Sequence, residues 1–135
     1  MHLVLNKAFC SLFFITFLFS PLVKADLSYE VRGTERVSGM FGDAICVSLY
    51  IVNDTRQQYE FNLFTTSAKG DGLSSTPSIF TDKKPAFDPN TALSPNSKAR
   101  GWLCFDEPEY GWVPEVIEFS EAWGSKFLTV KVQKD

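Results

Sequence analysis

The fold of this chain is indicated most clearly by residues 44–52, which read AICVSLYIV. Apolar residues recur at every second position, which is the period of a β-strand with one buried face. The stronger apolar face consists of Ile45, Val47, Leu49 and Ile51. Cys46, Ser48, Tyr50 and Val52 make the opposite face, and Asn53-Asp54 follows with turn-forming residues. The stretch therefore predicts a strand that packs one face into a core.

The same alternation recurs on both sides of this strand. An opening strand begins at Leu27 and ends at Gly33. Further strands are predicted at Tyr59–Thr65, Ile79–Thr81, Ala99–Asp106, Glu115–Ser120 and Lys126–Val132. No stretch of any length in residues 26–135 predicts a helix.

Turn-forming residues dominate the middle of the chain. Ser67–Pro77 contains two glycines and several Ser and Thr residues, and is predicted to be a loop. Lys83–Ser97 contains three prolines and is predicted to be mostly irregular. Short strands separated by turn signals predict an all-β protein, an antiparallel immunoglobulin-like β-sandwich of about seven strands. A small barrel is the alternative.

Residues 1–25 have the pattern of a cleavable signal peptide. One lysine, Lys7, precedes an apolar run from Ala8 to Phe19, and Val23 and Ala25 suit cleavage before Asp26. The apolar run is shorter than the roughly 20 residues that a membrane-spanning helix needs. We therefore expect a mature domain of residues 26–135, secreted or periplasmic, with no membrane span after cleavage.

The charge and the histidine content argue against several classes of function. Without Lys7 and Lys24, 11 basic and 16 acidic residues remain, a net charge of −5 that argues against a nucleic-acid partner. The leader also contains the chain's one histidine, His2. Ser-His-Asp and Cys-His catalysis need an imidazole base, and most zinc sites use His. We expect no catalytic residues, no metal and no cofactor.

Two stretches resemble a known family. Residues 47–54 and 93–108 are similar to the paired strand signatures of the telokin-like, immunoglobulin-related domains of bacterial exported proteins, which include secreted antigens. In that family a Pro-Gly turn leads into the second strand, whereas this chain has Asn96 after Pro95. The resemblance implies an extracytoplasmic binding or interaction module rather than an enzyme.

Two cysteines remain after the leader, and an exported domain allows them to pair. Alternation places Cys46 and Cys104 on the outer faces of their strands. In the related folds these strands are antiparallel neighbours, and a register with Val52 opposite Lys98 sets Cys46 opposite Cys104. We therefore predict a cross-strand disulfide on the outer face of one sheet. Two unpaired buried thiols are the alternative.

The candidate ligand-binding residues lie in the stretch from Trp102 to Trp112, which covers the end of one predicted strand and the connection to the next: Trp102, Glu107, Glu109, Tyr110 and Trp112. Aromatic and carboxylate side chains on one loop are typical of a surface that binds a protein or a glycan. Trp102 is expected on the outer face beside Cys104. Tyr110 and Trp112 have a second interpretation, as side chains that fold back over the core.

These observations predict an exported, non-catalytic interaction domain with a protein or surface-glycan partner. One alternative is a secreted enzyme inhibitor that acts through residues 66–97. Another is a carboxylate-based glycan hydrolase using pairs among Glu107, Glu109, Glu115 and Glu118. Residues 53–55, Asn-Asp-Thr, also form an N-glycosylation sequon.

Overall fold

Residues 27–39, 42–78 and 83–132 are described by a computed structural model. They form nine strands and one short 3-10 helix, η1 (Leu63–Thr65). The strands are β1 (Ser28–Gly39), β2 (Gly42–Asn53), β3 (Tyr59–Glu60), β4 (Thr66–Gly70), β5 (Leu73–Ser75), β6 (Ala92–Leu93), β7 (Ser97–Asp106), β8 (Val116–Ser120) and β9 (Lys126–Lys131). The predicted leader and the predicted strand at residues 79–81 lie outside the described residues.

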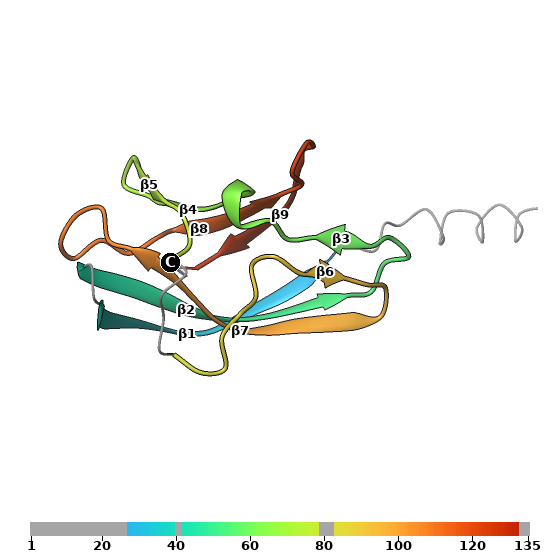
Figure 1. Cartoon of the computed structure of the whole chain (residues 1–135), viewed down its shortest axis with the longest axis horizontal. Coiled ribbons are helices and arrows are strands. Elements are labelled where there is room, and N and C mark those ends of the chain that lie inside the picture. Colours follow the sequence, from blue (N-terminus) through green and yellow to red (C-terminus); the bar gives the residue numbers. More distant parts are fainter. Residues whose placement is uncertain (1–26, 40–41, 79–82, 133–135) are drawn as a thin grey trace, which may run out of the picture.

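Two antiparallel sheets face each other as the layers of a sandwich (Figure 1). One sheet has the order β1-β2-β7, and the other has the order β5-β4-β8-β9. β3 and β6 form a separate two-stranded pair near one end. The predicted fold class, an all-β antiparallel sandwich, is confirmed.

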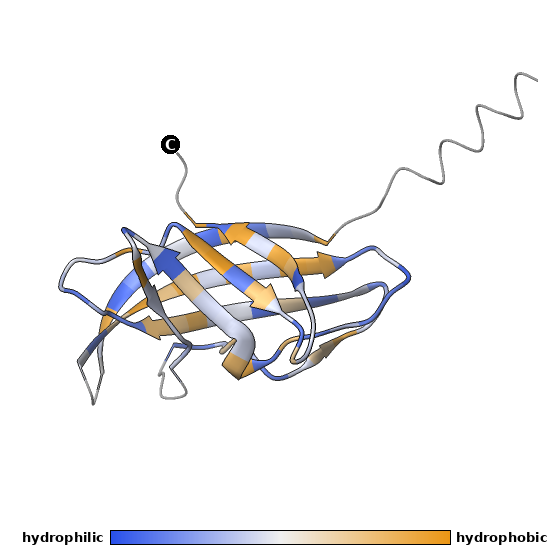
Figure 2. Cartoon of the chain, turned by 90° about the horizontal axis from the view of Figure 1, so that it is seen from above, coloured by the Kyte–Doolittle hydropathy of each residue, from blue (hydrophilic) through white to orange (hydrophobic). Residues whose placement is uncertain are grey.

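The core lies between the two sheets and follows the predicted alternation. All four side chains of the apolar face of β2 are at most 3% exposed. They belong to one cluster with residues from the opposite sheet, including Ile117, Phe119 and Val130. Figure 2 shows hydrophobic and hydrophilic residues alternating along the strands. Each large apolar side chain buried in this way contributes roughly 1.5–3 kcal/mol to folding.

The end of the first strand was predicted wrongly. β1 does not stop at Gly33 but continues to Gly39, and its pairing with β2 shifts between Val31 and Gly33. This β-bulge absorbs one extra residue, Arg32, and lets the strand continue past the glycine. The period of two is interrupted at the bulge, which is why the sequence pattern suggested an end.

Ser67–Pro77 is not a loop. It contains most of β4 and all of β5, joined by Asp71 and Gly72 with positive φ angles of 52° and 76°. Asp-Gly is the preferred pair for such a tight hairpin turn. The sequence pattern did not indicate this hairpin because its strands are mostly polar. The buried positions of β4 are occupied by small residues such as Ala68, which give no strong apolar alternation.

The predicted strand at Tyr59–Thr65 is shorter than expected. β3 covers two residues, and the chain then enters η1. The side-chain oxygen of Asn62 caps this helix by accepting a hydrogen bond from the Phe64 N–H at 2.8 Å. An Asn cap satisfies a backbone donor that a strand ending here would leave unpaired.

The turn before β7 accommodates the departure from the Pro-Gly pattern. Asn96 has a φ of 63°, the conformation for which glycine is usually selected. Asparagine tolerates this conformation better than other non-glycine residues. The N–H of Ser97 closes the turn on the carbonyl of Ser94 at 3.2 Å.

Candidate functional site

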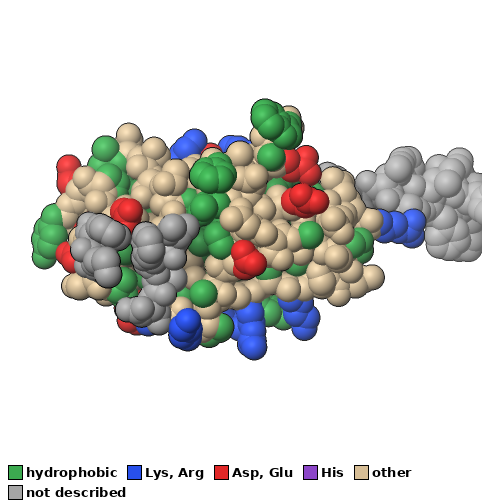
Figure 3. All heavy atoms as spheres, in the orientation of Figure 1, with side chains coloured by type: hydrophobic (Ala, Val, Ile, Leu, Met, Phe, Trp, Pro, Cys, Tyr) green, Lys and Arg blue, Asp and Glu red, His purple; other side chains and the backbone are tan. Residues whose placement is uncertain are grey.

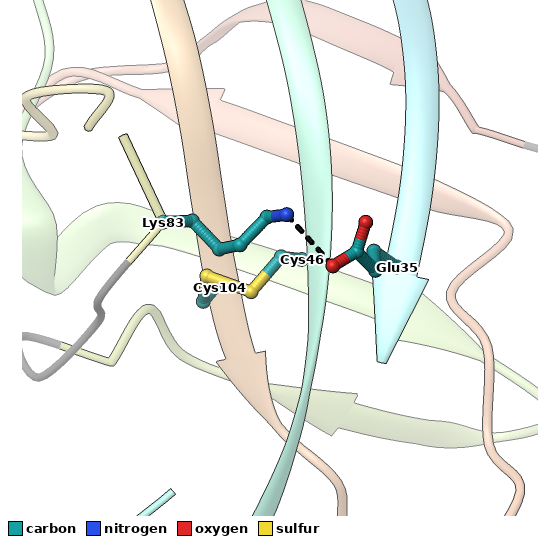
Figure 4. Close-up of a disulfide and its surroundings, with 4 residues drawn as sticks. All are labelled: Glu35, Cys46, Lys83 and Cys104. Atoms are coloured by element: carbon teal, nitrogen blue, oxygen red, sulfur yellow. Dashed lines mark hydrogen bonds and ion pairs between the residues drawn. A yellow bond between two sulfur atoms is a disulfide. The ribbon is translucent and has the colours of Figure 1, made fainter. Parts of the chain in front are cut away.

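Cys46 and Cys104 form a disulfide between β2 and β7 (Figure 4). The two residues are direct partners in the antiparallel register, as are Val52 and Lys98, and their Cα atoms are 3.9 Å apart. Both cysteines lie in a small apolar cluster separate from the main core. The predicted cross-strand bridge on the outer face is confirmed.

The disulfide is fully buried although it lies on an outer face. Val37, Ala44 and Trp102 pack around it. Lys83 extends beside the sulfur atoms and pairs with Glu35 at 2.7 Å (Figure 4). Because attack on a disulfide requires access to sulfur, this cover favours a structural bond rather than a redox-active one.

Trp102 lies on the outer face beside Cys104 but is half-buried. The ammonium group of Lys83 lies 4.3 Å from the centroid of its ring. The segment around Ala86 runs beside β7. There the backbone N–H of Trp102 donates to the carbonyl of Pro85 at 2.9 Å, and the backbone carbonyl of Trp102 accepts from the Phe87 N–H at 3.0 Å. The backbone of Trp102 therefore anchors this segment against β7.

Glu107 is held within the turn that follows β7. Its carboxylate pairs with Arg36 of β1 and accepts from the Gly111 N–H at 3.3 Å. Arg36 also donates to the carbonyl of Trp112 at 3.1 Å, and its hydrogen bond with Glu107 raises the pKa of the guanidinium. Glu107 thus fixes the turn to β1.

Trp112 belongs to the core. It is 3% exposed, and its Nε1–H donates to the carbonyl of Gly70 at 2.9 Å. Its predicted role as a ligand contact is therefore wrong, because no ligand reaches a buried indole. Glu109 and Tyr110 remain on the surface of this turn, and Tyr110 is 88% exposed.

Glu118 does not have the properties of a catalytic acid. Its carboxylate lies between Lys69 at 2.8 Å and Lys126 at 2.9 Å. Hydrogen bonds from Lys69 and then Lys126 lower the pKa of Glu118. A general acid of a glycosidase needs a raised pKa, so this carboxylate is unsuited to that role.

Replacement of Glu118 by glutamine is expected to lower the free energy of unfolding at pH 7 by about 1 kcal/mol, the range of surface ion pairs. A lowered folded-state pKa stabilises the protein above the unfolded-state pKa, and this stabilisation is lost as the pH falls through the folded-state value. Urea titrations should show the deficit at pH 7 and a progressively smaller deficit as the pH falls below the unfolded-state pKa. Glu115→Gln, at an exposed position, is the control; an equal deficit there would contradict the assignment.

Two exposed aromatic side chains lie on neighbouring turns of the four-stranded sheet. Phe64 in η1 is 86% exposed, and Trp123 in the β8–β9 turn is 100% exposed. The Thr65 hydroxyl donates to the carbonyl of Ser120 at 2.6 Å and so joins the two turns. We call this pair of side chains the aromatic end.

The backbone beneath the aromatic end is well connected. Leu63 N–H donates to the side chain of Asn90 at 2.8 Å, and the Asn62 carbonyl accepts from the Thr66 hydroxyl at 2.8 Å. In the hairpin, Gly124 N–H donates to the carbonyl of Glu121 at 3.2 Å. These bonds connect the turns that carry the two exposed aromatic side chains.

A shallow groove of about 330 Å³ begins beside η1. It is lined by Leu63, Phe87, Asp88, Pro89, Asn90 and Trp102, among others. Figure 3 shows hydrophobic side chains gathered on this face of the molecule. The groove is thus partly apolar, and Leu63, one of its lining residues, directly precedes Phe64 in the sequence.

Sequence reasoning missed the aromatic end. Phe64 fell within a predicted strand, where alternation drew attention to Phe61 and Leu63 instead. Trp123 stands next to Gly124 between two predicted strands, and a large aromatic residue in a predicted turn is the signal that could have identified it.

The sequon asparagine has a structural role. Asn53 is fully buried, and its side-chain amide donates to the carbonyls of Gln57 at 2.8 Å and Leu93 at 3.0 Å. Its Oδ1 atom accepts from both the N–H and the hydroxyl of Thr55. A glycan on this amide is incompatible with the folded turn, because it would displace these bonds.

Residues 27–39, 42–78 and 83–132 contain no group of three or more His, Cys, Asp or Glu side chains arranged to hold a metal ion. None of the helices among these residues is long and apolar enough to cross a membrane.

Comparison with known proteins supports the fold. No protein-family model matches the chain, and no curated protein matches it. A solved structure with a similar fold is that of MPT63, a secreted protein from Mycobacterium tuberculosis. The two chains share 13% sequence identity, with a TM-score of 0.54, over 78% of this chain and 82% of MPT63. At this identity the likeness establishes the β-sandwich fold alone.

Proposed function

We propose that this protein is an exported, non-catalytic interaction domain that binds a partner protein through the aromatic end. The observation that carries the proposal is the exposure of Phe64 and Trp123, at 86% and 100%, on two turns joined by a hydrogen bond. Aromatic side chains are enriched at protein–protein interfaces and among the residues that contribute most of the binding energy.

Four further points support this proposal. The predicted leader directs the chain out of the cytoplasm, and the resemblance to exported immunoglobulin-related domains implies an interaction module. The predicted mature chain lacks histidine. Of the carboxylates considered for hydrolysis, Glu107 and Glu118 are engaged in ion pairs.

The proposal is tested by capture of partners from native extracellular material. The secreted protein is used as bait beside the double variant Phe64→Ser/Trp123→Ser, and captured proteins are quantified by mass spectrometry. Truncation of a central aromatic contact costs about 2 kcal/mol or more in binding free energy. The amount of specific partner that the variant captures is therefore expected to fall at least about tenfold.

Tyr110→Ser is the matched control, because Tyr110 is an equally exposed aromatic residue on a different turn. It should retain the partner. Loss with Tyr110→Ser and retention with the double variant would move the binding site to the Glu107–Trp112 turn and overturn the assignment. Circular dichroism spectra should remain unchanged in both variants, since all three side chains are exposed.

A further inference from the structure

The outer face of the β1-β2-β7 sheet contains a second surface, centred on Tyr50. Antiparallel register places Glu30 and Arg100 on either side of Tyr50, and Val52 beside Lys98. The guanidinium of Arg32 lies 4.1 Å above the Tyr50 ring, and the Lys98 ammonium lies 5.9 Å from it. Two cations therefore lie against one aromatic ring, and a third, Arg100, is the cross-strand neighbour of Tyr50.

The β-bulge explains how Arg32 reaches this position. Arg32 is the extra residue between Val31 and Gly33, and a bulge re-aims side chains at the point where regular pairing is interrupted. Glu30 holds the same guanidinium at 2.9 Å. The arginine is thereby pre-oriented on the ring, and its side chain remains 46% exposed.

The charge of this surface is opposite to that of the domain. Arg32, Lys98 and Arg100 stand against the single carboxylate of Glu30, while the predicted mature chain has 11 basic and 16 acidic residues. Figure 3 shows Lys and Arg side chains projecting along the edge of the molecule where Figure 1 places this sheet. We call Arg32, Tyr50, Lys98 and Arg100 the cationic face.

We propose that the cationic face binds an acidic polysaccharide, a sugar chain with sulfate or carboxylate groups. Arginine binds such oxyanions through paired N–H donors, and its attachment to the Tyr50 ring reduces the side-chain entropy lost on binding. The central strand, β2, is hydrogen-bonded to β1 on one side and β7 on the other. The centre of the face therefore offers side-chain donors and no free backbone edge, which suits a sugar chain better than an acidic peptide.

This surface is independent of the proposed protein-binding function. The cationic face belongs to the β1-β2-β7 sheet, whereas the aromatic end is formed by turns beside β4 and between β8 and β9. The variant Phe64→Ser/Trp123→Ser should therefore bind the saccharide like the parent. Failure of one proposal leaves the other testable by its own variants.

The test is titration calorimetry of the secreted protein with a heparin-derived octasaccharide as the probe. Lys98→Gln/Arg100→Gln should weaken binding at least about tenfold. It should also reduce the slope of log affinity against log salt by about two, one for each cation removed. Lys126→Gln/Lys131→Gln makes the same charge change on β9 and should leave the affinity within about twofold if the site is local.

Substitutions at Tyr50 distinguish binding at a defined site from nonspecific attraction between opposite charges. Tyr50→Phe keeps the ring beneath Arg32 and should bind like the parent, whereas Tyr50→Leu removes the ring and should weaken binding severalfold. Equal weakening by the β9 variant would overturn the proposal. So would equal or stronger binding of polyglutamate or single-stranded DNA, and so would no binding of the octasaccharide at low salt.

Discussion

Replacement of Cys46 and Cys104 together by alanine is expected to lower the free energy of unfolding by about 4 kcal/mol. The disulfide closes a loop with a sequence separation of 58 residues. In the chain-entropy model, opening a loop of this length restores roughly 4 kcal/mol of conformational freedom to the unfolded state. Such a loss is a large share of the 5–15 kcal/mol that typically stabilises a domain.

The measurement is a urea titration followed by tryptophan fluorescence, with the oxidised parent as reference. Reduced parent protein is the control and should unfold close to the double variant, because both lack the cross-link. A deficit below about 1 kcal/mol in the variant would show that the disulfide contributes little. The double replacement is preferred to a single one, which leaves a free thiol in the buried cluster around Trp102.

Gly101→Ala is expected to destabilise the domain by about 4 kcal/mol or more, at the severe end for a single substitution. Gly101 has a φ of 142°, and a Cβ atom there would lie 2.5 Å from the backbone nitrogen of Phe87 and 2.6 Å from the carbonyl carbon of Ala86. These are backbone atoms of the segment hydrogen-bonded to Trp102. The added methyl group therefore forces that segment away from β7.

Gly42→Ala separates the effect of the positive φ angle from the effect of the backbone clash. Gly42 has a similar φ of 124°, and a Cβ atom there meets nothing within 4 Å. Only the conformational strain remains, about 1–3 kcal/mol. Gly101→Ala should show a clearly lower melting temperature and a clearly lower soluble yield than Gly42→Ala. Equal stability would show that the close approach of the Ala86 backbone is unimportant.

The disulfide was predictable because local alternation combines with a strand pairing that the resemblance to related folds implied. Alternation in β2 and β7 determines which side chains face outward, and once the two strands pair at Val52 and Lys98, Cys46 must meet Cys104. The same alternation identified the core face of β2. The period is a property of each strand, so a sequence pattern can show it, whereas the pairing of the two strands came from the resemblance.

The candidate binding site was less predictable. Trp112 and Tyr110 are close in the sequence and of similar chemistry, yet one is 3% exposed and the other 88%. The difference arises because the carbonyl of Gly70, on the opposite sheet, accepts the indole N–H of Trp112. Such a partner is distant in sequence, so no local pattern could assign burial within the turn.

The sequence by itself determined the β-strand period, the outward direction of both cysteines and hence the all-β class. It did so because alternation and turn chemistry act over a few residues. The tertiary structure decided which aromatic side chains are exposed, and it brought Arg32 onto Tyr50 across the bulge. Those outcomes depend on packing between segments that the chain's topology brings together, and that packing is not encoded in the spacing of any one stretch.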